Sequence, residues 1–303
     1  MTRKKGPTAG SGGQGKRRLQ GRGPTPRAEN RPGHPAARRA ATARAVKAQR
    51  SESEDTVAGR NAVVEALQAE VPATALFVAS SLEFDKRVAE ALRIARGRGL
   101  SVHERPRSDL DRLTGGATHQ GLVLAVAPYD YLDPDDLLAR AAETGDAALV
   151  VALDGVTDPH NLGAIIRSAV AFGAHGVVVP VRRSARMTPG AWKASAGTAA
   201  RLPVARATNL PRTLDRYADA GVTIVGLTAD AAGATDLTDF DDTGAVALVA
   251  GAERTGLSRL VREKCAVEVA VGLAAGAESL NVSVAVGVAL YAVASCRRAA
   301  GRL

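Results

Sequence analysis

Five short, valine-rich apolar runs constrain the fold of this 303-residue chain more than any other feature of its sequence. The runs are Ala147–Leu153, Gly176–Val179, Val222–Leu227, Ala245–Ala250 and Ala266–Val271. Helical stretches separate them, and a long helix from Leu280 to about Arg298 closes the chain. Continuous apolar strands that alternate with helices are typical of a parallel sheet covered on both faces. We therefore expect an α/β domain over residues 147–303.

A second, smaller α/β domain is expected over residues 56–127. Helical periodicity over 59–70 and 83–98 is interleaved with apolar strand patterns over 75–79, 100–104 and 121–127. The next segment holds two Pro and four Asp between Pro128 and Asp136, a composition typical of a loop or of a capped helix start. We therefore expect residues 128–146 to form a linker.

Positive charge is concentrated at the N-terminus. Residues 1–50 contain 14 Lys and Arg and a single acid, Glu29, whereas the remainder holds 26 basic and 30 acidic residues. The same segment is rich in Gly, Pro, Arg and Ala and has few bulky apolar residues, so it cannot bury a core. We expect residues 1–55 to be a disordered basic tail that attracts a polyanion such as RNA, or that only aids solubility.

Several classes of protein are disfavoured by what the sequence does not contain. Cys265 and Cys296 provide no disulfide framework, and neither they nor the five His have the spacing of metal ligands. The folded part shows no GxGxxG or GxxxxGK[ST] motif, which argues against a dinucleotide enzyme and a P-loop ATPase. The apolar runs are too short for a membrane span, and no signal peptide is visible. We expect a cytoplasmic protein without a metal or a membrane partner.

Three polar, glycine-containing segments follow strands of the expected sheet. They are residues 154–163, 251–256 and 272–281. Ligands of open parallel sheets bind beyond the carboxyl ends of the strands, where such loops converge. The sequence therefore predicts one ligand site at this edge, although Gly and Asn also serve as ordinary turn residues.

A long interval without acids points to a nucleic acid as the substrate. Between Asp158 and Asp215 the chain has eight Arg and Lys and no Asp or Glu. We expect RNA phosphates to be bound by Arg182, Arg183, Arg186 and Lys193. A solvated basic face is the alternative. Trp192 either stacks on a base or packs in the core.

The three polar segments resemble the three motifs of the SpoU/TrmH branch of the SPOUT methyltransferases. The first is DGVTDPHNLGAIIRSA at 154–169, the second LVAGAERTGLS at 248–258, and the third ESLNVSVA at 278–285. The small domain, with His119-Gln120-Gly121 before its last strand, is similar to the family's L30e-like RNA-binding domain. The resemblance covers residues 56–300, and within the branch it is greatest to enzymes that methylate a guanosine ribose of 23S ribosomal RNA.

The resemblance implies a reaction, a methyl donor and an assembly. The family transfers a methyl group from S-adenosylmethionine to a ribose 2′-hydroxyl of RNA, acts as a homodimer with the active site at the subunit interface, and carries a C-terminal trefoil knot. Gly251, Val271 and Leu280 would contact the donor. The chain departs from the family at Gly272, where a Pro is usual, and glycine loosens such a loop. Small residues at 279, 283 and 287 would let another helix approach closely, from the partner or from the same subunit.

The resemblance also implies catalytic residues. These are Arg167 and Asn161, with Glu253, Ser279 and Asn281 around them. A guanidinium stays protonated in proteins, so Arg167 is better suited to stabilise an alkoxide or to grip a phosphate than to act as a base. Taken singly, Arg167 could instead pair with an acid, and Asn161 could cap its helix.

Three other functions share these features. A transfer RNA 2′-O-methyltransferase of the same fold is one, although such members usually lack the small domain. An adenosine ribose methyltransferase that confers resistance to a ribosome-targeting antibiotic is another. The third is a non-catalytic RNA-binding protein of ribosome assembly, which the presence of Asn161, Arg167, Glu253 and Asn281 disfavours.

Overall fold

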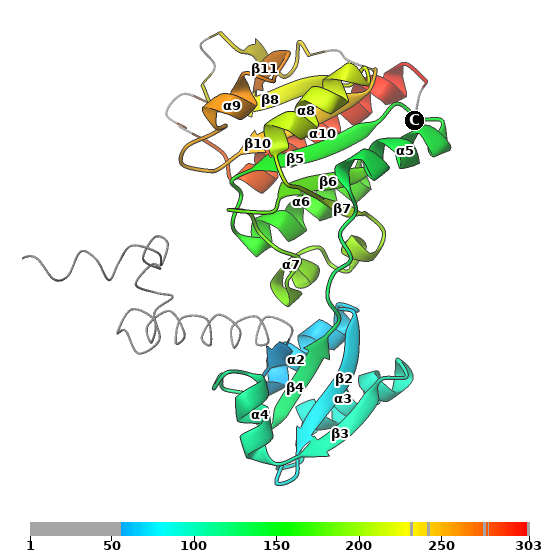
Figure 1. The fold of residues 1–303 in the computed structure, drawn as a ribbon, viewed down its shortest axis with the longest axis vertical. Coiled ribbons are helices and arrows are strands. Elements are labelled where there is room, and N and C mark those ends of the chain that lie inside the picture. The colour runs from blue at the N-terminus through cyan, green and yellow to red at the C-terminus, as the bar shows by residue number, and fades with distance from the viewer. Residues whose placement is uncertain (1–55, 231–232, 241–242, 275–276, 278, 302–303) are drawn as a thin grey trace, which may run out of the picture. The chain divides into compact units, whose positions relative to one another are not determined.

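The computed structural model describes residues 56–230, 233–240, 243–274, 277 and 279–301, so the predicted basic tail lies outside the described residues. The described residues belong to one unit of the chain, residues 52–303, which contains two sheets. The smaller sheet lies in the N-terminal part of this unit, and the larger one follows it along the chain (Figure 1).

The small domain is a four-stranded sheet with the strand order β1-β4-β2-β3. Its strands are β1 (Thr56–Ala58), β2 (Ala73–Ala79), β3 (Ser101–Arg105) and β4 (Leu122–Val126), and its helices are α2 (Arg60–Gln68), α3 (Lys86–Gly97) and α4 (Arg107–Leu113). Strands β2 and β3 pair in parallel, whereas β4 runs antiparallel to both β1 and β2. Both helices and all three strands that the sequence predicted are present. Strand β1 and helix α4 were missed.

The large sheet is parallel, as predicted. Its order among the described residues is β7-β6-β5-β10-β8-β11-β9, and every pair of neighbours is parallel. The strands are β5 (Leu149–Asp154), β6 (Gly176–Pro180), β7 (Val204–Ala207), β8 (Thr223–Thr228), β9 (Thr235–Asp236), β10 (Val246–Gly251) and β11 (Val267–Ala270). The five valine-rich runs form β5, β6, β8, β10 and β11. The short strands β7 and β9 were not predicted.

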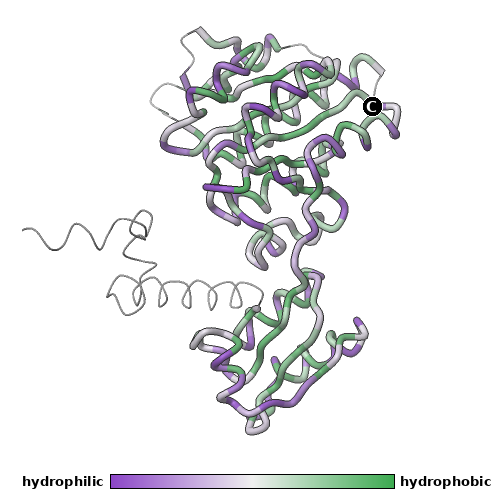
Figure 2. Tube along the Cα trace, in the orientation of Figure 1, coloured by the Kyte–Doolittle hydropathy of each residue, from purple (hydrophilic) through white to green (hydrophobic). Residues whose placement is uncertain are grey.

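Helices cover both faces of this sheet, as the continuous apolar pattern requires. The helices are α5 (Pro134–Thr144), α6 (Pro159–Ala171), α7 (Pro189–Ala194), α8 (Leu210–Asp219), α9 (Arg259–Arg262) and α10 (Val282–Ala299), with a 3-10 turn at Thr198–Ala200. Leu149 and Val151 of β5 pack in one apolar cluster with α6 and α10. Val150 packs in a second cluster with α5, α8 and α9 on the opposite face. Figure 2 shows the strands of this sheet as predominantly hydrophobic.

The predicted linker, residues 128–146, is more regular than we expected. Asp133 caps α5 by accepting a hydrogen bond from the Asp135 amide at 3.0 Å, and Pro134 occupies the first turn. Leu137 is fully buried against the sheet. Half of the segment is therefore a covering helix of the large domain.

The closing helix α10 is long and apolar enough to cross a membrane by length and composition alone. Its residues Val286, Ala289 and Leu290 are fully buried in the core cluster that also contains α6. The helix therefore has the packing expected of a core helix. The trefoil knot that the family resemblance implies stays a prediction.

Candidate functional site

The strand register brings the three polar segments to one edge of the large sheet. Asp154, the last residue of β5, lies directly beside Gly251, the last residue of β10. From β5 the chain winds outward through β6 and β7, and then returns to form β8 on the far side of β10. Such a reversal in strand order opens a crevice at the carboxyl ends of the strands, where ligands bind.

Three motif residues that are far apart in the sequence form a hydrogen-bonded cluster in this crevice. The side-chain amide of Asn161 donates to Glu253 Oε1 at 3.0 Å. The amide of Asn281 donates to the same oxygen at 2.8 Å and to Asn161 Oδ1 at 3.0 Å. Each of the three motifs supplies one member, so the structure brings these three predicted residues together.

Helix starts position two members of the cluster. Asp158 caps α6 by accepting from the His160 amide at 2.9 Å, which places Asn161 in the first helical turn, where it is buried. Asn281 is itself the N-cap of α10, since its Oδ1 accepts from the Ser283 amide at 2.9 Å. The capping role that the sequence left open for Asn161 is thus performed by Asp158.

The third member lies on a tight turn after β10. Ala252 and Gly256 exchange two main-chain hydrogen bonds, of 3.1 and 2.8 Å, across this turn. A Cβ atom at Gly251 would lie 2.1 Å from the carbonyl carbon of Gly256, so this position requires glycine. The carboxylate of Asp154 accepts from the Ser258 amide at 2.6 Å and ties the end of the turn to β5. Glu253 is therefore held by a well-braced loop.

Two adjacent cavities meet at the cluster. The first, here called the apolar cavity, has a volume of about 200 Å³ and is lined by all three predicted donor contacts, Gly251, Val271 and Leu280. Ser279 and Glu253 form part of its polar rim, and the rest of the wall includes Leu227, Val269, Leu273, Val282 and Ala285. The second, here called the loop cavity, has a volume of about 340 Å³ and is lined by residues 155–158, Asn161 and Thr255. Ala252, Glu253, Arg254 and Val282 line both cavities.

This arrangement suits the transfer of a group between two bound molecules. The apolar cavity can hold a flat apolar ring system, with main-chain and hydroxyl groups at its rim for polar atoms. The loop cavity offers hydroxyl, amide and carboxylate groups to a polar molecule. Because the two share a wall at Glu253, their occupants can meet there. No group of three His, Cys, Asp or Glu side chains that could hold a metal ion exists in the described ranges.

Arg167 is not part of either cavity in this chain. It is exposed on α6, six residues after Asn161, and the helical repeat turns the two side chains to different faces. Within the described part of the chain no acid pairs with it, so the ion-pair alternative is not supported. The small residue Gly287 packs against Ser168 of the same chain, where an added Cβ would lie 3.3 Å from the hydroxyl oxygen. That position accordingly serves packing within the subunit.

The predicted RNA contacts lie mostly on the surface. Arg182, Arg183 and Arg186 are exposed in the loop that follows β6, at the carboxyl edge of the sheet. Lys193 forms an ion pair with Glu65 at 2.7 Å, so it is already engaged. Trp192 is only 4% exposed, which excludes base stacking and confirms the packing alternative.

Sequence reasoning missed several residues of the site. Leu227 and Thr228 line the apolar cavity from the carboxyl end of β8, and Arg254 lines both cavities. The rule that ligands bind at strand ends would have identified the first two, because Leu227 ends a valine-rich run and Thr228 follows it. The position of Arg254, next to Glu253 in the second motif, could have identified it as a site residue.

Comparison with known proteins identifies relatives of both domains. The sequence profile of the "SpoU rRNA Methylase family" matches residues 148–291, and the profile "RNA 2'-O ribose methyltransferase substrate binding" matches residues 56–132. A protein of Mycobacterium sp. (strain KMS) with the name "Uncharacterized tRNA/rRNA methyltransferase" is 58% identical over 299 residues, which are 97% of this chain and 95% of that protein.

Solved structures show the same similarity. The SpoU methyltransferase AviRb from Streptomyces viridochromogenes, determined in complex with AdoMet, matches with a TM-score of 0.59 and 29% identity, over 80% of this chain and 90% of that one. The AdoMet-bound rRNA methyltransferase from Sinorhizobium meliloti matches with a TM-score of 0.54 and 25% identity, over 82% and 89% of the two chains.

Proposed function

Since the chain belongs to the SpoU rRNA methylase family, we propose that it transfers a methyl group from S-adenosylmethionine to a ribose 2′-hydroxyl of 23S ribosomal RNA, with guanosine as the nucleoside. The observation that carries this proposal is the cluster of Asn161, Glu253 and Asn281 at the wall shared by two cavities. We place the reaction in the cytoplasm.

The apolar cavity fits the methyl donor. Leu227, Val271 and Leu280 provide apolar surface for an adenine ring, and Gly251 lets the main chain approach closely. Ser279 and Glu253 provide polar groups for a ribose and an amino acid moiety. When bound, S-adenosylmethionine supplies a methyl carbon that its positive sulfonium makes electrophilic.

The protein's own part in the reaction is orientation and charge. Two amide donors occupy Glu253 Oε1, which leaves the second carboxylate oxygen to accept a hydrogen bond from a hydroxyl group of a ligand. Asn161 and Asn281 hold that carboxylate in place. Aligning the attacking oxygen with the methyl carbon removes much of the entropic cost of the reaction. A cation beside the oxygen stabilises the alkoxide that forms as the proton leaves.

Arg167 provides that cation from a second copy of the chain. Arg167 lies on α6, which packs against α10, and α10 exposes an apolar stripe of Val284, Val288 and Tyr291. These residues are spaced by four and three positions, so they share one face of the helix. An exposed stripe of this kind is typical of a protein interface. A homodimer formed through it would supply Arg167 of one subunit to the cavities of the other.

The experiment is transfer of a labelled methyl group to ribosomal RNA. We expect Arg167→Ala to abolish transfer while donor binding persists, and full activity of this variant would contradict its role. A mixture of Arg167→Ala and Asn281→Ala chains, each inactive alone, should regain activity because hybrid dimers contain one complete site. No regain would contradict the shared site.

Mapping of 2′-O-methyl groups identifies the substrate. Ribosomal RNA from cells without the gene should lack one 2′-O-methyl group, on a guanosine of 23S RNA. Loss of a methyl group from transfer RNA instead, or from an adenosine, would support one of the alternative methyltransferases.

A further inference from the structure

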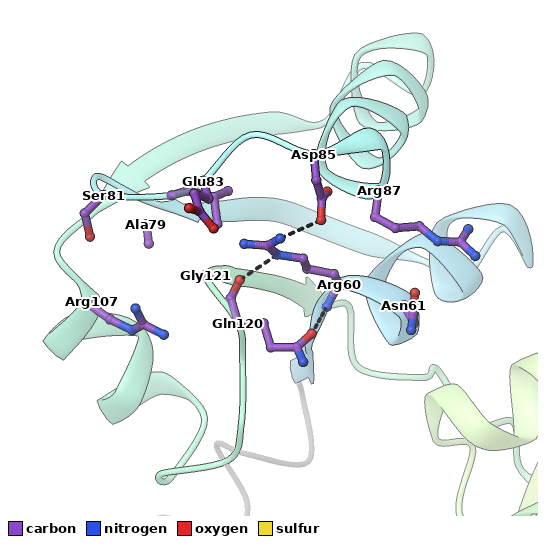
Figure 3. A pocket seen from close by; sticks show the side chains of 11 residues that line it. Arg60, Asn61, Ala79, Ser81, Glu83, Asp85, Arg87, Arg107, Gln120 and Gly121 are labelled. Carbon is purple, nitrogen blue, oxygen red and sulfur yellow. Dashed lines mark hydrogen bonds and ion pairs between the residues drawn. The ribbon is translucent and has the colours of Figure 1, made fainter.

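The small domain contains a cavity that the methyl-transfer site does not use. Its volume is about 710 Å³, within the range of about 300–1,000 Å³ that is usual for ligand pockets. It is lined by the start of α2, the loop from Ala79 to Asp85, the start of α4, and the turn at Gln120-Gly121 (Figure 3). We call it the small-domain pocket.

The floor of the small-domain pocket is braced by Arg60. Its guanidinium contacts Asp85 Oδ2 at 2.5 Å and donates to the main-chain oxygen of Gln120 at 3.2 Å (Figure 3). Asp85 also caps α3 by accepting from the Val88 amide at 2.8 Å. That hydrogen bond first, and Arg60 after it, lower the pKa of Asp85, so its carboxylate stays charged. The guanidinium of Arg60 and the carboxylate of Asp85 are therefore already engaged with each other.

A strained turn presents the amide of Gln120 to the pocket. Gln120 has a φ of 49°, which is unusual for a residue other than glycine, and Gly121 follows with a φ of 83°. His119, only 3% exposed, supports the turn: Nδ1 accepts from the Gly121 amide and Nε2 contacts Asp111, both at 3.0 Å. The Gln120 side-chain carbonyl accepts from the Arg60 amide at 3.4 Å, so the NH₂ group is left to donate. Strain of this kind is concentrated at ligand sites.

The remaining groups of the small-domain pocket suit a nucleotide. Arg107, at the start of α4, is exposed at its rim, and no described residue pairs with it. A free guanidinium is well matched to a phosphate. Glu83 and the Gln120 NH₂ group offer an acceptor and a donor, which are the groups that read the edge of an unpaired base.

An exposed aromatic ring lies next to the small-domain pocket in the chain. Phe84, between Glu83 and Asp85, is 72% exposed. It lines a second hollow of about 330 Å³ together with Leu92, Arg93 and Arg96 of α3. Exposed aromatic side chains among cations are typical of proteins that bind single-stranded nucleic acid, because every base can stack on the ring.

We propose that the small-domain pocket binds an unpaired nucleotide of the substrate RNA, and that the neighbouring base stacks on Phe84. Arg107 contacts the phosphate, and Gln120 and Glu83 contact the base edge. This inference rests on the proposed function for the identity of the RNA. In this proposal the small domain binds a single-stranded loop or bulge of the RNA, at a site separate from the methylated ribose.

The test uses the full chain and a short RNA of mixed sequence, either single-stranded or paired in a duplex. Phe84→Ala should weaken single-strand binding about tenfold, the effect of one lost stacking contact. Arg107→Ala should lower the slope of log affinity against log salt by about 0.7, the value for one phosphate contact on a single strand. Arg140→Ala is the matched control, because Arg140 is exposed on α5, outside both hollows. It should change neither quantity.

Two results would overturn the proposal. One is unchanged single-strand affinity in both Phe84→Ala and Arg107→Ala. The other is an equal loss for the duplex, which would show that the surface binds paired RNA. A titration with S-adenosylmethionine and a transfer assay on the parent chain separate this failure from failure of the proposed function. If the parent transfers methyl groups but both variants bind single-stranded RNA normally, only the proposal for the small domain is refuted.

Discussion

Asn281 gives the sharpest test of the site, because one side chain both caps a helix and holds the cluster together. Asn281→Ala removes the N-cap of α10, which costs about 1 kcal/mol. It also removes hydrogen bonds of 3.0 Å to Asn161 and 2.8 Å to Glu253, each contributing about 0.5–1.5 kcal/mol. We therefore expect the free energy of unfolding to fall by about 2–4 kcal/mol.

Asn209 provides the matched control. It caps α8 by accepting from the Arg212 amide at 3.1 Å, and its side chain belongs to no cluster among the described residues. Asn209→Ala should therefore lose only the cap, about 1 kcal/mol. Urea unfolding of both variants, followed by circular dichroism, measures the difference. Equal losses would show that the three-residue cluster contributes nothing beyond the cap, and would refute the view that it acts as a unit.

A double-mutant cycle then isolates the contact with the carboxylate. In a Glu253→Ala background, Asn281→Ala should cost less than it does in the parent chain, because one of its hydrogen bonds is already gone. We expect a coupling free energy of about 0.5–3 kcal/mol. A coupling of zero would mean that the 2.8 Å hydrogen bond between Asn281 and Glu253 contributes nothing to the free energy of unfolding.

Three further changes probe the core, the pH response and the donor loop. Arg297 is 3% exposed and donates to three main-chain carbonyls, so Arg297→Lys should lower the unfolding free energy by about 2–4 kcal/mol, whereas Arg298→Lys, at an exposed neighbour, should not. Burial lowers the pKa of His175 below 6.5, so the unfolded chain binds its proton first. Stability is then full above about pH 6.5 and falls as the pH drops toward the lower folded-state pKa, and urea titrations should show a shallower fall for His175→Gln. Gly272→Ala should raise affinity for S-adenosylmethionine about two- to fivefold in a calorimetric titration, because the unbound loop loses the extra conformational freedom of glycine and the added Cβ meets only Asp236 Oδ2, at 3.0 Å. Weaker binding would contradict this.

The sequence predicted the large sheet well because its strands are buried on both faces. A run such as Val246–Gly251 is apolar throughout, and in a chain with helical spacers that pattern strongly favours a buried parallel strand. Strand β7, Val204–Ala207, was missed because it has four residues, includes Arg206 and lies at an edge. For helix α5 the sequence left a loop and a capped helix start open, because the Pro and Asp residues that cap its start are also typical of loops.

The site was predicted by resemblance, and its geometry required the structure. Asn161 and Glu253 are 92 residues apart, and Asn281 is 120 residues from Asn161, so no local pattern could place them in contact. The reversal of strand order that brings β10 between β5 and β8 is a property of the topology. The small-domain pocket was hidden for a similar reason: the φ of Gln120 is imposed by its neighbours and leaves no mark in composition.

Helix α6 presents two residues of the first motif on different faces. Its first turn carries Asn161 into the crevice of its own chain, while Arg167 emerges on another face and is exposed. A fixed helix cannot turn both side chains toward one cavity, because six residues rotate its face by about 240°. Under the proposed function, this spacing fits a site that Arg167 of a second chain completes. The proposed dimer would use the exposed stripe on α10, which packs beside α6. If the proposed dimer forms through this stripe, Val288→Asp should give a monomer that binds S-adenosylmethionine but transfers no methyl group, as gel filtration and a transfer assay would show.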